Sequence, residues 1–139
     1  MLLLLVQAAI GMIVNLNVTI PTRHPGGHPS DYFSGSFHSI AWAITHGAVA
    51  LAAHAALGLA LVFIALAIAI SALRLRGGSI GLWSSIAALL VIGAGFNGAS
   101  FLDFNNDTSS LVMALLAFAA IACYSIVTFL LASAASSDE

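Results

Sequence analysis

Four long apolar runs dominate this sequence, and they constrain its fold more than any other feature. The runs cover residues 2–20, 39–73, 80–102 and 109–132. A helix needs about 20 residues to cross the hydrocarbon core of a bilayer. Only helices and closed barrels satisfy their backbone in lipid, and strict alternation is absent, so the runs are expected to be helices. The sequence therefore predicts one domain, residues 1–139, folded as an all-α, four-helix transmembrane bundle running up-down-up-down.

The charge content supports this assignment and excludes other classes of protein. Of 139 residues, three are Lys or Arg and five are Asp or Glu, and the mean hydropathy is +1.11. A soluble domain carries about a quarter charged residues, and a nucleic-acid-binding protein needs a basic surface. We therefore expect an integral membrane protein whose partner is the lipid bilayer and which binds no nucleic acid. The absence of Lys and the abundance of Ala are typical of a bacterial source.

The cations predict an orientation. Arg74 and Arg76 lie in the short turn between the second and third runs. By the positive-inside rule this turn is cytoplasmic. Both termini are then cytoplasmic as well, and residues 21–37 form a long outer loop. The predicted location is the plasma membrane, with several passes.

The second run is longer than one perpendicular span requires. At 1.5 Å per residue, a helix over residues 39–73 would reach about 50 Å. Either the helix projects beyond the membrane or its first turns lie along the interface. Trp42 suits an interfacial position.

Two short segments resemble each other. Gly11 precedes Asn15 by four residues in the first run, as Gly93 precedes Asn97 in the third. A duplicated two-helix hairpin would explain this match, and chance would explain it equally well.

The second run contains the most prominent candidate for a binding site. His46, Ala50, His54 and Gly58 follow one another at i+4 steps and share one ridge. An ionisable residue inside a span is a functional hypothesis by default, and Gly58 would let a flat ligand approach the backbone below His54. The structural alternative is a neutral His54 that hydrogen-bonds a neighbouring asparagine or carbonyl. Proton handling is a third interpretation.

Other polar and small residues favour contacts between helices. Asn15 and Asn97 are predicted to reach across the bundle, since amides bridge helices in lipid. Gln7 shares a ridge with Gly11 and Asn15, which indicates a close helix contact. A ridge of small residues on another face of the second run predicts tight helix packing, and it consists of Ala48, Ala52, Ala56 and Ala60.

The outer loop holds a candidate metal site. Imidazole and carboxylate groups suit copper or zinc, and the region offers His24, His28, Asp31 and His38. Their spacing matches no fixed metal signature. The prolines and glycines between them describe a turn-rich loop equally well.

With a histidine near the outer end of the second of four spans, the chain resembles half of a heme A synthase and small four-helix membrane cytochromes. In that pattern the second and fourth spans each offer a histidine, and heme b lies between them. His54, or alternatively His46, matches the first position. The fourth span contains no histidine, and the acidic residue and cysteine pair of the synthase are missing. The resemblance implies a heme-protein relative whose site is lost or altered.

Three functions follow from these patterns. The first is a non-catalytic accessory or assembly subunit of a larger membrane complex, bound to other membrane subunits or to itself. The second is a redox membrane protein that holds heme b or copper at the outer leaflet through His54 and His46. The third is a small permease, although the apolar inner half offers a solute no polar path. The sequence shows no nucleophile–base pair or phosphate loop, which favours a role other than catalysis.

Overall fold

The computed structural model describes residues 1–75 and 78–136 of the chain, and this part is built from helices and their connections. The turn residues Arg76 and Gly77 and the acidic residues at 138–139 lie outside the described ranges. Five helices follow one another: α1 (Leu2–Asn17), α2 (Tyr32–His46), α3 (Val49–Leu75), α4 (Gly78–Phe104) and α5 (Asp107–Ser136).

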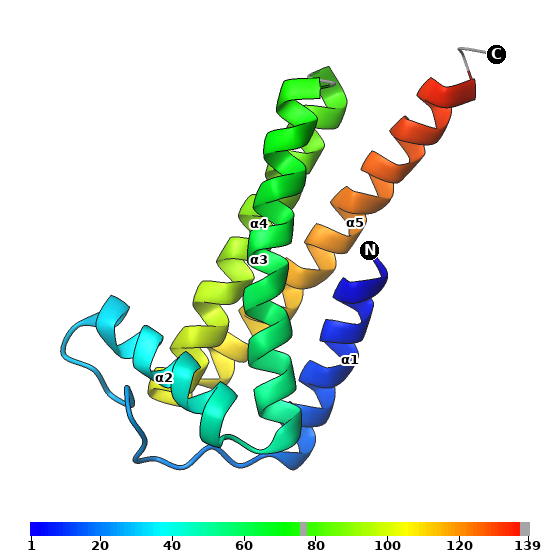
Figure 1. Ribbon diagram of the computed structural model, residues 1–139. Coiled ribbons are helices and arrows are strands. Elements are labelled where there is room, and N and C mark those ends of the chain that lie inside the picture. Colours follow the sequence, from blue (N-terminus) through cyan, green and yellow to red (C-terminus); the bar gives the residue numbers. More distant parts are fainter. Residues whose placement is uncertain (76–77, 137–139) are drawn as a thin grey trace.

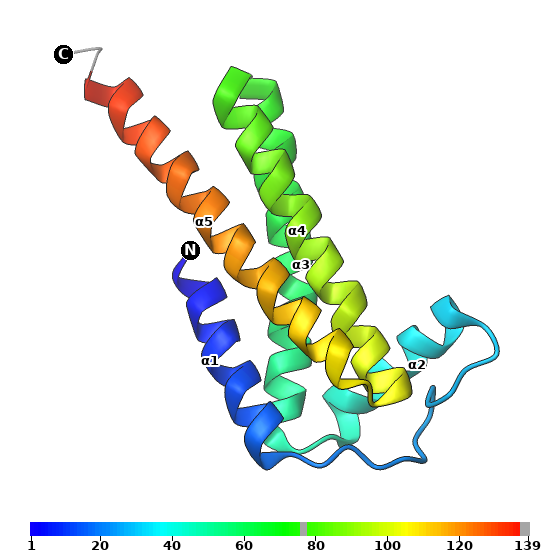
Figure 2. The same ribbon diagram turned by 180° about the vertical axis from the view of Figure 1, so that it is seen from behind.

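Three of these helices are long and apolar enough to cross a membrane, namely α3, α4 and α5. Helix α1 is also apolar, but its 16 residues span only about 24 Å. Successive apolar helices run in opposite directions in both views (Figures 1 and 2), and α3 packs on α1 and α4 while α4 packs on α5. The protein is thus a small multi-span membrane protein with a packed helical bundle, as its composition predicts.

The first apolar run does not stay helical to its end. Helix α1 stops at Asn17, and Val18 is already extended with φ −114° and ψ 119°. Val18, Thr19 and Ile20 are β-branched, which disfavours a helix, and Pro21 disfavours the α conformation at Ile20. Ile20 nevertheless stays buried, so this short extended segment still packs against the bundle.

The prediction of one helix over residues 39–73 is wrong. The helix is interrupted at Gly47 and Ala48, where Gly47 is extended with φ −69° and ψ 163°. A Cβ on Gly47 would lie 2.4 Å from the carbonyl oxygen of Ala43 and 3.1 Å from Leu51, so only glycine permits this tight turn. His46 therefore ends α2 and His54 lies in α3, and the ridge predicted to join them does not form.

Helix α2 also begins earlier than predicted. Its first residues, 32–37, fall in the predicted outer loop but are helical in the structure. The carboxylate of Asp31 accepts a 2.8 Å hydrogen bond from the backbone N–H of Ser34, which caps the first turn. The helix packs on α3 and α4 at one end of the bundle, as Figure 1 shows. We call this the capped end, and it comprises residues 18–31, α2 and the adjoining ends of α3 and α4.

The connection between the third and fourth apolar runs, which leaves residues 103–108 outside both, is shorter in the structure. Helix α4 continues to Phe104, and α5 begins at Asp107. Only Asn105 and Asn106 remain between them, and Asn105 has a φ of 49°. Asn tolerates this left-handed conformation better than most residues. Asp103 consequently lies inside α4, although the sequence placed it in a solvated loop.

Candidate functional site

Asp103 is the most deeply placed acidic residue in the described chain. Its side chain is 1 % exposed, and its Oδ2 accepts a 2.8 Å hydrogen bond from the hydroxyl of Ser36 on α2. Within the described residues, Oδ1 of Asp103 has no hydrogen-bond partner. Burying a carboxyl group with only one hydrogen-bond partner costs free energy. The single bond from Ser36 on α2 is therefore structurally important.

The segment before α2 is attached to the same end of α4. The backbone N–H of His28 donates a 2.8 Å bond to the carbonyl of Asp103, and Nε2 of His24 lies 3.0 Å from the carbonyl oxygen of Leu102. The last carbonyls of a helix lack partners within it. The segment supplies two of these partners to α4, and His24 also stacks on Trp42 with ring centroids 4.5 Å apart.

Tyr32 attaches the first turn of α2 further along α4. Its hydroxyl donates a 2.9 Å bond to the carbonyl of Phe96 and lies 2.9 Å from the hydroxyl of Ser100. Together with the bond from Ser36 to Asp103, this contact fixes α2 to α4 at two levels. The capped end is therefore a rigidly connected unit and not a free loop.

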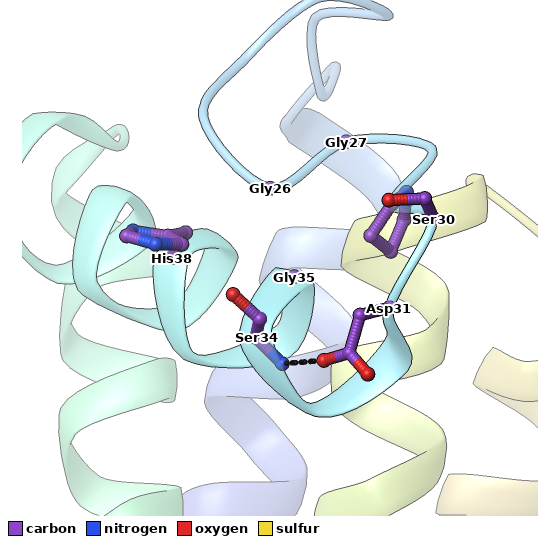
Figure 3. Close-up of a pocket in the computed structure, with 8 residues that line it drawn as sticks. Gly26, Gly27, Ser30, Asp31, Ser34, Gly35 and His38 are labelled. Atoms are coloured by element: carbon purple, nitrogen blue, oxygen red, sulfur yellow. Dashed lines mark hydrogen bonds between the residues drawn. The ribbon is translucent and has the colours of Figure 1, made fainter.

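A shallow open hollow of about 230 Å³ lies between this segment and α2. Figure 3 shows the segment crossing above α2, with Ser34 and His38 on the helix below it and Asp31 at the helix start. Gly26 approaches α2 so closely that a Cβ there would lie 2.4 Å from the carbonyl of Gly35 and from the hydroxyl of Ser39. The hollow has a polar lining, formed by Gly26, Gly27, Pro29, Ser30, Asp31, Ser34, Gly35 and His38.

The four predicted metal ligands do not converge in this region. His24 is bound to Leu102 and stacked on Trp42, and the ring of His28 contacts Phe104. Asp31 caps α2, and His38 lines the hollow from the next turns of that helix. Across residues 1–75 and 78–136, no group of three or more His, Cys, Asp and Glu side chains is placed to hold a metal ion.

A second polar pair lies between α1 and α3. The Nε2 amide of Gln7 donates a 3.0 Å bond to the carbonyl of His54 and lies 3.3 Å from the Nε2 of the His54 ring. Because the carbonyl fixes this amide nitrogen as the donor, the ring Nε2 must be the acceptor. His54 is then the neutral tautomer with its proton on Nδ1. This arrangement is of the kind that the structural alternative for His54 describes, but the partner is the glutamine Gln7 and not an asparagine.

Gly11 and Gly58 make this contact possible. A Cβ on Gly11 would lie 2.8 Å from the His54 ring, and a Cβ on Gly58 would lie 3.0 Å from the Gln7 amide. The space beside Gly58, which the sequence offers to a flat ligand, is thus occupied by Gln7. His46 is exposed on α2, where its Nδ1 lies 2.7 Å from the hydroxyl of Thr45.

The two asparagines make different contacts. Asn15 accepts a 3.4 Å bond from Ser110 on α5, so it reaches a neighbouring helix at an exposed position. Asn97 donates a 2.8 Å bond to the carbonyl of Gly93 in its own helix, so this bond does not cross the bundle. In both predicted repeats the glycine faces another helix, Gly11 toward α3 and Gly93 toward Leu116 of α5.

Sequence reasoning missed the polar contacts at the capped end. Asp103 and Phe104 are followed by Asn-Asn-Asp, which is typical of a loop, and nothing in the sequence marks Asp103 as buried. Ser36 and Tyr32 were assigned to the outer loop. A helix pattern was present nonetheless, since Gly35, Ser36, Ser39 and Ala43 are small residues at helical spacing, and they form the buried face of α2.

Comparison with known proteins adds no further assignment: no protein family matches the sequence, and neither a curated protein nor a solved structure is detectably similar to it.

Proposed function

We propose that this membrane protein is a non-catalytic subunit of a larger membrane assembly and that it packs against a helix of another subunit, or of a second copy, through one face of α3. The observation that carries the proposal is the composition of that face. It points away from the bundle and is exposed, yet it is formed largely by small side chains. We call it the alanine face, and it consists of Ala53, Ala56, Ala60 and Ala67, with one large side chain, Phe63, on the same ridge between Ala60 and Ala67.

The alanine face lies opposite the side of α3 that contacts the bundle. The buried residues of α3 are Leu51, Leu61, Ala65 and Ala69. The predicted small-residue ridge is largely exposed in the structure, because Ala48, Ala56 and Ala60 are exposed and Ala52 is half-buried. Small residues let helix backbones approach closely, and they are enriched where membrane helices meet.

Other exposed surfaces of the bundle differ in composition. On α5 the exposed positions combine small side chains, such as Ala119 and Ala122, with large apolar ones, which suit contact with acyl chains, at Leu111, Leu115, Phe118 and Phe129. The alanine face therefore matches a helix partner better than it matches lipid. The polar pairs support a structural role, because Gln7 joins α1 to His54 and Ser36 joins α2 to Asp103.

The test is the mass of the assembly extracted in a mild detergent. The double variant Ala56→Leu/Ala60→Leu adds bulk to the alanine face. The matched control, Ala119→Leu/Ala122→Leu, adds the same bulk to exposed positions on α5. Native electrophoresis should show a complex heavier than the 14.2 kDa chain for the unmodified protein and the control, and loss of that complex for the α3 variant. A monomer in every case, or an unchanged complex in the α3 variant, would contradict the proposal.

The redox function, with heme b or copper bound through His54 and His46, is the alternative. It requires the Nε2 lone pair of His54, which here accepts from Gln7, and the open side of Gly58, which Gln7 covers. A visible absorption spectrum of the purified protein separates the two proposals. A Soret band that disappears in His54→Ala would favour the redox function over the subunit function.

A further inference from the structure

Helix α2 has three faces of different chemistry. Its buried face packs on the bundle through Gly35, Ser36, Ser39 and Ala43. A second face, at i, i+4 and i+7 spacing, is apolar and is formed by Phe33, Phe37, Ile40 and Ile44, of which the two phenylalanines are exposed while both isoleucines are half-buried and Ile40 packs against the core. About 100° further around the helix, Ser34, His38 and Thr45 form an exposed polar face. We call the apolar face that carries Phe33 and Phe37 the aromatic face.

We propose that the aromatic face is a lipid-binding surface, which lies at the boundary between the headgroups and acyl chains of the same bilayer that the bundle spans. Phe33 is 62 % exposed and Phe37 is 75 % exposed, and they are neighbours one turn apart. Helices that lie in a membrane interface bury such an apolar face and keep a polar face toward water. The proposal depends on the membrane assignment and not on the subunit proposal.

The contacts of α2 place its first turn at membrane depth. The ring of Phe33 meets the ring of Phe96 edge to face, with centroids 6.3 Å apart, and Tyr32 bonds the Phe96 carbonyl. Phe96 lies eight residues before the end of α4, which is about 12 Å along the helix axis. A helix of 27 residues is about 40 Å long and exceeds the hydrocarbon thickness of about 30 Å. The excess is about 10 Å, so Phe96 lies inside the hydrocarbon and within about 12 Å of its edge.

The aromatic face also continues an apolar surface that the membrane assignment already requires. Phe96 is 45 % exposed on a membrane-spanning helix, so its ring contacts lipid. Phe33 extends that surface from α4 onto α2, and Phe37 extends it by another turn. The polar face points to the other side, where Ser34 and His38 line the hollow shown in Figure 3. One helix can then contact the bundle, lipid and water at once.

Depth-dependent quenching tests this arrangement. In a Cys123→Ser background, which removes the single native cysteine, Phe37→Cys and His38→Cys are each labelled with an environment-sensitive fluorophore and reconstituted into phosphatidylcholine vesicles. The two sites are adjacent but lie on the aromatic and polar faces. Quenching by doxyl groups near the top of the acyl chains should be several-fold greater at position 37. Quenching by aqueous iodide should be several-fold greater at position 38.

Two results would overturn the proposal. If both sites respond equally to iodide and neither responds to doxyl lipid, α2 lies in water. If position 37 is shielded from both quenchers, protein covers the aromatic face. Should a labelled variant fail to fold, the unmodified protein decides the question: a lipid with a photoreactive diazirine near the top of its acyl chain should modify Phe33 or Phe37. Modification of the bundle helices alone would overturn the proposal as well.

Discussion

The hydroxyl of Ser36 donates a 2.8 Å hydrogen bond to Oδ2 of Asp103, and this bond joins α2 to the end of α4 where both side chains are buried. The two residues are 67 positions apart in the sequence. The contact connects a segment with a polar, turn-rich sequence to a membrane-spanning helix. It is also the only hydrogen bond that the carboxylate of Asp103 makes within the described residues.

We expect Ser36→Ala to destabilise the protein. The substitution leaves both carboxylate oxygens of Asp103 buried without a partner, which costs about 1–3 kcal/mol. Ser34→Ala is the matched control, because Ser34 is exposed and bonds Asp31 through its backbone N–H, which alanine retains. The free energy of unfolding in mixed detergent micelles measures the difference. Equal stability of the two variants would show that the buried bond contributes nothing.

Gly26→Ala should detach the segment that precedes α2. Gly26 has a φ of +91°, and a Cβ there would lie 2.4 Å from the Gly35 carbonyl and 2.5 Å from the backbone nitrogen of Ser39. Neither backbone group can move aside without shifting α2. Gly27→Ala is the control, since its nearest contact would be 3.3 Å from the His24 carbonyl. Limited proteolysis within residues 21–31 should be faster in Gly26→Ala only, and equal rates would refute the expectation.

Gly11→Ala should weaken the contact between α1 and α3. Alanine favours a helix over glycine by about 1 kcal/mol, but the added Cβ would lie 2.8 Å from the His54 ring, which Gln7 holds in place. Gly95→Ala gains the same helix preference and meets Val62 at an ordinary 3.5 Å. The thermal unfolding midpoint should therefore fall for Gly11→Ala and stay level or rise for Gly95→Ala. A rise in both would mean that the helices separate at little cost.

The sequence predicts the apolar helices well because lipid imposes a length and a composition on each of them. Their ends are less predictable, since they depend on particular residues. The β-branched Val18 and the tight turn at Gly47 end helices inside runs that remain apolar. The burial of Asp103 is not predictable at all, because it depends on a helix 67 residues away. The ridge of Gln7 and Gly11 predicts a close helix contact, but it identifies neither the helix, α3, nor the specific partner, His54.

The pair formed by Gln7 and His54 allows the two hydrogen bonds of one amide to be measured separately. Gln7→Ala removes both the 3.0 Å bond to the His54 carbonyl and the 3.3 Å contact with the ring. His54→Ala removes only the ring contact, because the backbone carbonyl remains. Hydrogen bonds between membrane helices contribute about 0.6 kcal/mol on average and up to about 1.7 kcal/mol. Gln7→Ala should therefore lower the free energy of unfolding more than His54→Ala does.

A double-mutant cycle completes this prediction. In the His54→Ala background, Gln7→Ala should still cost free energy, since the bond to the carbonyl is lost there too. The difference between the two costs gives the contribution of the ring contact, which should be the smaller one because its 3.3 Å distance is long for a hydrogen bond. If Gln7→Ala has no effect once His54 is alanine, the carbonyl bond contributes nothing, and the ring contact accounts for the whole contribution of this amide.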